Sequence, residues 1–125
     1  MKYFLICPVR NATEEQRQQM VAWIVQKESA GDTVYYPARD TNQNDSIGYR
    51  ICRDNRQALA IADKIAIFWD KTSQGSLFDL GMAFALEKPI EIINVDEIEP
   101  TESKSFSNMM LMWRNVSDNK YRYIN

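Results

Sequence analysis

The 125-residue chain contains no histidine. This absence excludes Ser-His-Asp and Cys-His catalysis and removes the side chain on which most catalytic zinc sites depend. Any acid–base or nucleophilic chemistry must therefore use carboxylates, tyrosine, lysine, serine or cysteine. We expect neither a metal ion nor another cofactor.

Excess positive charge and long apolar runs are also missing. The net charge is −2, so no basic field can hold a nucleic-acid backbone, and we expect no nucleic-acid partner. The apolar run at residues 3–9 is too short for a signal peptide or a membrane span. The only cysteines, Cys7 and Cys52, suit reduced thiols better than a disulfide framework. These features predict a cytoplasmic protein with no membrane partner.

What is present is a chain of ordinary globular composition, with 45% apolar and 26% charged residues, and its length fits one domain over residues 1–125. Short apolar runs alternate with helical patterns, the first of which opens with a capping box at Thr13 and stops near Gly31. Three more helical patterns follow, over 47–62, 77–87 and 106–113. Strands are predicted over 3–9, 33–37, 64–69, 90–95 and 120–124.

This alternation predicts an α/β fold, a doubly wound parallel five-stranded sheet with helices on both faces, as in flavodoxin-like or Rossmann-like three-layer sandwiches. Ligands of such sheets lie outside the carboxyl ends of the strands, near the switch in strand order. We therefore expect Arg10, the 38–46 loop and the 70–76 loop to share one cleft.

The segment SQGSLFDLGMAFALEKPIEII, residues 73–93, is the most informative part of the chain. Its first residues lead into a predicted helix, whose free N–H groups and dipole suit an anion. Ser73 and Ser76 add hydroxyl groups, and Gly75 lets the backbone approach a ligand. Asp79 has two interpretations. Ser76-x-x-Asp79 resembles a capping box, which stabilises a helix by roughly 1 kcal/mol, or the carboxylate does chemistry.

Residues 62–90, ADKIAIFWDKTSQGSLFDLGMAFALEKPI, resemble the core of the nucleoside 2-deoxyribosyltransferase family and of its relatives, the 2'-deoxynucleoside 5'-phosphate N-hydrolases. The resemblance places Asp79 where the family has its nucleophilic glutamate. The family's second catalytic aspartate, which assists proton transfer to the base, falls at Asn55, and Asp54 lies one residue away. Asp79, Asn55 and Asp54 are thus the predicted catalytic residues.

The likeness extends to both ends of the chain. KYFLICPVR is similar to the family's first strand, which implies that Tyr3 lines the sugar pocket and that Arg10 contacts a 5'-phosphate. Ser73 matches a serine of the phosphohydrolase branch. SNMMLMWRNVSDN is similar to a transferase segment whose asparagine enters the neighbouring subunit's site, and Asn108 is the match. The resemblance therefore implies a homodimer or higher homo-oligomer with shared sites.

The implied activity is cleavage or transfer at the N-glycosidic bond of 2'-deoxynucleosides or their 5'-monophosphates. A carboxylate beneath C1' would stabilise the oxocarbenium-like centre or trap it as an ester. Free nucleosides and 5'-phosphates are both open as substrates. Because Asp79 is one methylene shorter than glutamate and Asn55 is no acid, the alternative is a homologue that binds a nucleotide or nucleotide-derived ligand without turnover. A third interpretation is a structural dimer module without a small ligand.

Overall fold

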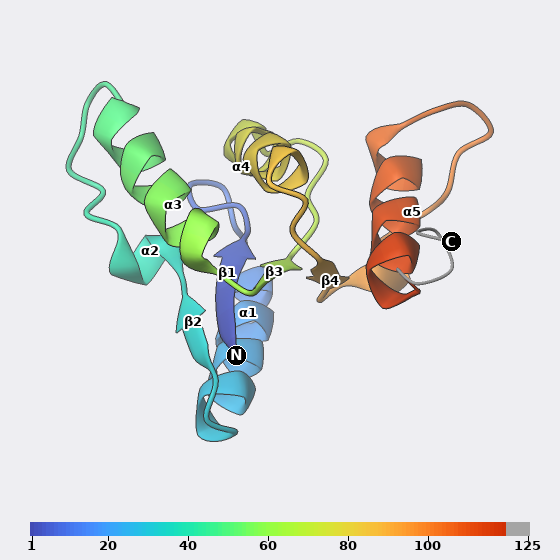
Figure 1. The fold of residues 1–125 in the computed structure, drawn as a ribbon. Helices are drawn as coiled ribbons and strands as arrows, with labels where there is room; N and C mark the ends of the chain where they lie inside the picture. The colour runs from blue at the N-terminus through green and yellow to red at the C-terminus, as the bar shows by residue number, and fades with distance from the viewer. Residues whose placement is uncertain (120–125) are drawn as a thin grey trace.

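The computed structural model describes residues 1–119 (Figure 1). Strands and helices alternate along the chain, as the sequence predicts. Their order is β1 (Lys2–Ile6), α1 (Glu14–Ser29), β2 (Thr33–Tyr35), α2 (Pro37–Asp40), α3 (Tyr49–Ile61), β3 (Lys64–Ile67), α4 (Gln74–Ala85), β4 (Ile90–Ile92), the 3-10 turn η1 (Val95–Glu97) and α5 (Phe106–Asp118). No helix of this part of the chain has the length and apolar character needed to cross a membrane.

The strands form one parallel sheet in the order β2-β1-β3-β4. In this register Phe4 of β1 lies between Tyr35 of β2 and Ile65 of β3. The sheet of residues 1–119 has four strands where the sequence predicts five. The fifth predicted strand, 120–124, lies outside the described residues, so β4 forms the edge of the described sheet.

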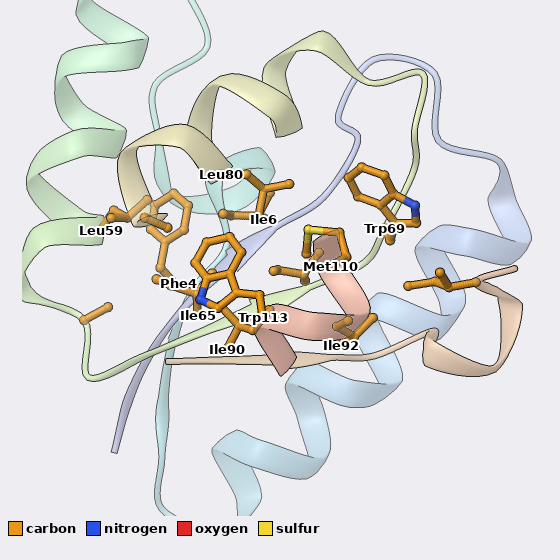
Figure 2. Close-up of a cluster of buried hydrophobic side chains, with 14 residues drawn as sticks. Phe4, Ile6, Leu59, Ile65, Trp69, Leu80, Ile90, Ile92, Met110 and Trp113 are labelled. Atoms are coloured by element: carbon orange, nitrogen blue, oxygen red, sulfur yellow. The ribbon is translucent and has the colours of Figure 1, made fainter. Parts of the chain in front are cut away.

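Helices cover both faces of the sheet, as predicted. Because successive strand residues point to opposite faces, Phe4 and Ile6 of β1 join one core while Tyr3 and Leu5 join the other. The larger core packs against α3, α4 and α5, and Figure 2 shows strand side chains meeting Trp113 and other residues of these helices. The smaller core packs against α1.

Local signals set the start of α1. The Thr13 hydroxyl accepts the Gln16 N–H at 3.1 Å, and the Gln16 side chain accepts the Thr13 N–H at 2.9 Å. This reciprocal pair satisfies two N–H groups that would otherwise lack partners, so the predicted capping box is confirmed. After the helix, Gly31 adopts φ +96°, a left-handed conformation that favours glycine.

The strand order fixes where a ligand can enter. From β1 the chain crosses to β2 through α1 on one face, and from β3 it crosses to β4 through α4 on the other. The loops that leave β1 and β3 therefore diverge from neighbouring strand ends. In parallel sheets this divergence opens a crevice at the carboxyl edge.

Candidate active site

Helix α4 begins at this crevice, three residues before its predicted start. The Ser73 hydroxyl accepts the Ser76 N–H at 3.2 Å and is the N-cap. Asp79 lies in the second turn of the helix, and no described group donates a hydrogen bond to its carboxylate. The capping-box interpretation of Asp79 is therefore wrong, because Ser73 fills the role that it would need.

The Asp79 side chain is half-buried. Burial raises its pKa to about 7, since ionisation in a poorly solvated place is unfavourable. Burial, and then the charge of Asp79, raise the pKa of Cys7 to about 12. The same two causes, with Asp45 in third place, raise the pKa of Cys52. Helix α4, which carries Asp79, contacts both β1 and α3, and the thiols of Cys7 and Cys52 are free.

Ser76 is the second unusual group of this helix. It is 2% exposed, and its hydroxyl oxygen has no hydrogen-bond partner within residues 1–119. A buried hydroxyl left unpaired costs about 1–3 kcal/mol. Ser76 and Asp79 are three residues apart and therefore neighbours on the helix surface. An unpaired donor, a helix N-terminus and an unpaired carboxylate occur together within two turns of α4.

The structure brings several predicted ligand residues to this edge. Ser73, Gly75 and Ser76 lie in or next to the first turn of α4, although the Ser73 hydroxyl is already engaged as a cap. Arg10 lies exposed in the loop that follows β1, at the same edge of the sheet.

The loop between β3 and α4 is fixed from β4 by Asn94, a residue that the sequence analysis does not identify. The buried Asn94 amide accepts the Trp69 N–H at 2.8 Å and donates to the Trp69 carbonyl at 2.9 Å. It also donates to Glu97 at 3.0 Å. An asparagine directly after an apolar strand is the only sequence signal for this role.

We expect Asn94→Ala to lower the free energy of unfolding by about 2–3 kcal/mol, because it leaves the buried Trp69 N–H and carbonyl unpaired. Urea denaturation measures this loss. Asn115→Ala, an exposed replacement on α5, is the matched control and should change stability by less than about 0.5 kcal/mol. Equal stability of the two variants would contradict the role given to Asn94.

Two of the predicted catalytic residues, Asn55 and Asp54, lie on α3, and both have partners other than Asp79. Asn55 is buried and accepts a hydrogen bond from the Thr41 hydroxyl at 2.7 Å, which in turn contacts the Tyr35 hydroxyl at 2.6 Å. Asp54 projects about 200° around the helix from Cys52 and pairs with Arg50 at 2.9 Å. Asn55 thus belongs to a polar chain toward β2, and Asp54 faces away from the crevice.

Tyr3 lies at the opposite end of β1. Its ring packs edge-on against Trp23 of α1 with centroids 5.3 Å apart, and the Lys27 ammonium lies 5.3 Å from the ring centroid. Tyr3 precedes Cys7 by four residues, about 13 Å of extended chain. The structure does not bring the Tyr3 side chain to Asp79.

Asn108 is occupied within its own chain. Its amide accepts the Thr101 N–H at 2.9 Å and donates to the carbonyls of Thr101 at 2.9 Å and Ser103 at 3.0 Å. The side chain therefore fastens the loop before α5 to the first turn of that helix. An oligomer with shared sites stays a prediction, and both N–H groups of the Asn108 amide already have partners.

Within residues 1–119 no three side chains of the types His, Cys, Asp and Glu are grouped so that they could hold a metal ion.

The sequence matches no protein-family model and no curated protein. Among solved structures, a 2-deoxyribosyltransferase from Bacillus psychrosaccharolyticus is similar over 94% of this chain and 91% of its own, with a TM-score of 0.65 and 19% identity. A CMP N-glycosidase from Clostridium botulinum is similar over 74% of this chain and 67% of its own, with a TM-score of 0.53 and 23% identity. The chain has the 2-deoxyribosyltransferase fold. The fold implied by the resemblance of residues 62–90 is thereby confirmed, and α4 carries Asp79 at the carboxyl edge of this fold.

Proposed function

We propose that the protein cleaves or transfers the N-glycosidic bond of 2'-deoxynucleoside 5'-monophosphates, with the Asp79 carboxylate as the group that acts at C1'. The observation that carries this proposal is the position of Asp79, a half-buried carboxylate with no hydrogen-bond partner within residues 1–119, one turn after Ser76 at the start of α4. The two similar structures named above are a CMP N-glycosidase and a 2-deoxyribosyltransferase.

The reaction follows from the chemistry of a carboxylate near a sugar. As the bond between C1' and the base nitrogen breaks, its electron pair leaves with the base, and positive charge develops on the sugar. Ionised Asp79 stabilises this charge or forms an ester at C1'. Water then attacks C1' and releases Asp79, or a second base does so and forms a new nucleoside. The departing base takes its proton from water, because Asp54, the acid next to the predicted second catalytic position, is paired with Arg50.

The 5'-phosphate is favoured over a free 5'-hydroxyl by the start of α4. The N–H groups of its first turn and the helix dipole attract an anion. Ser76 supplies a buried hydroxyl that has no partner within residues 1–119. Arg10 lies in the loop after β1 and can provide a positive charge at the same edge.

Chromatographic detection of free base tests the proposal. The purified protein is incubated with a panel of 2'-deoxynucleosides and their 5'-monophosphates, with and without a second base. Release from the monophosphates supports the proposal, and an exchanged base identifies a transferase where free deoxyribose 5-phosphate identifies a hydrolase. Absence of release from every substrate contradicts it.

We expect Ser76→Ala to raise KM for the monophosphates about 10-fold, because one hydrogen bond to the phosphate is lost, and to leave kinetics with free nucleosides unchanged. The variant should fold normally, since the Ser76 hydroxyl has no hydrogen-bond partner in the described part of the chain. Ser29→Ala, at the end of α1, is the control. Equal KM values for wild type and Ser76→Ala with every monophosphate would exclude a contact between Ser76 and phosphate.

A second candidate function is binding without turnover. It is favoured by the position of Asp54 and Asn55, which leave Asp79 without an acid to protonate the base. A monophosphate that raises the melting temperature, with no base released, supports this candidate, because a ligand of the native state stabilises it.

A further inference from the structure

The edge of the sheet at β2 is covered by side chains that come directly after this strand. β2 (Thr33–Tyr35) is the outermost strand in the order β2-β1-β3-β4 and pairs with β1 on its inner side. The short helix α2 (Pro37–Asp40) follows it almost at once (Figure 1). An edge strand presents backbone N–H and carbonyl groups that can pair with a strand of another molecule. The outward groups of β2 therefore need partners or protection.

The register of β2 shows which backbone groups face outward. The Thr33 N–H donates to the Met1 carbonyl at 3.0 Å, so the backbone groups of Thr33 face β1. Along a strand, the backbone groups of successive residues point to opposite sides. Tyr36 continues the extended conformation, with φ −111° and ψ 105°. The backbone groups of Val34 and the Tyr36 N–H therefore point away from the sheet.

Arg39 and Asp40 bind to these outward groups. The Val34 carbonyl accepts a hydrogen bond from Arg39 Nη2 at 2.7 Å, and the Tyr36 N–H donates to Asp40 Oδ2 at 2.8 Å. The two side chains also bind each other, with Arg39 Nε 2.8 Å from Asp40 Oδ1 and Arg39 Nη2 2.9 Å from Asp40 Oδ2. The pair thus presents a donor and an acceptor to β2, as a neighbouring strand does.

The Arg39–Asp40 pair is held in place and stays charged. Glu28 of α1 accepts hydrogen bonds from both terminal nitrogens of Arg39 at 3.3 Å. Burial favours the neutral form of Asp40, but the hydrogen bonds from Arg39 and from the Tyr36 N–H outweigh it and lower the pKa of this carboxyl group. Because the Arg39 side chain is 44% exposed, its ion pairs contribute little to folding stability. Stability alone is therefore a weak reason for this arrangement.

We propose that the Arg39–Asp40 pair closes the β2 edge against strand addition by a second copy of the chain. A net charge of −2 supplies little repulsion between copies, so the edge depends on local protection. The open edge is complementary to itself. In a two-fold pair the two β2 strands run antiparallel, and Val34 of each copy exchanges N–H and carbonyl hydrogen bonds with the other. This role is separate from the reaction at Asp79.

Arg39→Met tests the role, because it removes the donors to the Val34 carbonyl and keeps the apolar stem of the side chain. Sedimentation velocity over a range of protein concentrations should show self-association about 10-fold or more stronger than that of wild type, since a pair of strand hydrogen bonds becomes available. Arg39→Lys retains a donor and should associate like wild type. Arg17→Met, which removes an exposed arginine paired with Glu14 at 3.5 Å, is the matched control and should also associate like wild type.

Hydrogen exchange identifies the surface through which the variant associates. The Val34 N–H of associated Arg39→Met should become protected, because it pairs with the second copy. Association that leaves this group unprotected places the contact elsewhere and overturns the proposal, as does association no stronger than that of wild type. Asp40→Ala removes the acceptor for the Tyr36 N–H and should associate in the same way, which provides a second variant if Arg39→Met does not fold.

A comparison with Asn94→Ala separates an open edge from a general loss of stability. Arg39→Met and Asn94→Ala are compared at temperatures that give both the same unfolded fraction. Stronger association of Arg39→Met under these conditions supports the proposal. Equal association of the two variants would mean that unfolded chains cause it, and the role given to the Arg39–Asp40 pair would be wrong.

Discussion

Asp79→Asn is expected to reduce base release by roughly 10³-fold or more, because an amide can neither form the ester at C1' nor neutralise the charge that develops there. The replacement keeps the size and shape of the side chain. It also removes no hydrogen bond, since no described group donates to the carboxylate. A loss of activity therefore reports on charge and nucleophilicity and not on packing. The measurement is the single-turnover rate of base release at saturating monophosphate.

Two further measurements make this prediction specific to an ionised carboxylate. The pKa of about 7 means that the rate should rise with pH through neutrality and level off above about pH 8. Asp79→Glu keeps the charge and should retain measurable release. A rate that falls as pH rises through 7 would mean that protonated Asp79 acts as an acid. Undiminished release by Asp79→Asn would exclude Asp79 from the chemistry.

Local signals in the sequence were sufficient for most elements of this fold, but not for the short helix α2 (Pro37–Asp40), where a strand end and a loop were expected. The Thr13 capping box involves residues three apart, and the apolar run of β1 reflects burial on both faces, so both can be read without tertiary information. The N-cap of α4 is equally local. It was missed because Ser73 and Ser76 are both good caps, and only the backbone shows that the helix begins after the first.

The spacing of residues in the sequence does not determine on which face of a strand or helix each site residue lies. Tyr3 and Phe4 are adjacent in β1, yet one packs on α1 and the other on the helices that include α4. Nothing in an all-apolar strand tells which face a given residue takes. On α3, a shift of one residue turns a side chain by about 100°, so the one-residue choice between Asp54 and Asn55 decides between a surface ion pair and a buried hydrogen bond.

Contacts between residues that are far apart in the sequence could not be predicted from local sequence patterns. Asn94 binds Trp69 across 25 residues of chain. A groove between α3 and α4 arises only when two separate helices pack. Asn108 shows the opposite case, since a residue matched to a partner-facing role is held by the loop next to it. The family resemblance predicted the fold correctly. The contacts of single residues could be seen only in the folded structure.

The same Asp79→Asn replacement is expected to stabilise the protein by about 2–4 kcal/mol at pH 8. Burial raises the pKa of Asp79 from 3.8 to about 7 in the folded protein, a difference of about 4 kcal/mol between the two protonation states, part of which water at the mouth of the crevice screens. The folded protein holds this proton more tightly than the unfolded chain does. Stability from the protonated carboxyl group is therefore complete below about pH 4 and is lost as pH rises through 7.

Urea denaturation of wild type and Asp79→Asn at pH 5 and at pH 8 measures this cost. The gap between the two proteins should be widest at pH 8 and less than half as large at pH 5, because asparagine has no proton to lose. Asp118→Asn, at a surface ion pair of 3.9 Å with Arg114, should change stability by less than about 0.5 kcal/mol at pH 8. A destabilised Asp79→Asn at pH 8 would mean that the carboxylate has a structural partner. A stabilised and inactive variant would mean that the fold tolerates a buried charge because the reaction at C1' requires it.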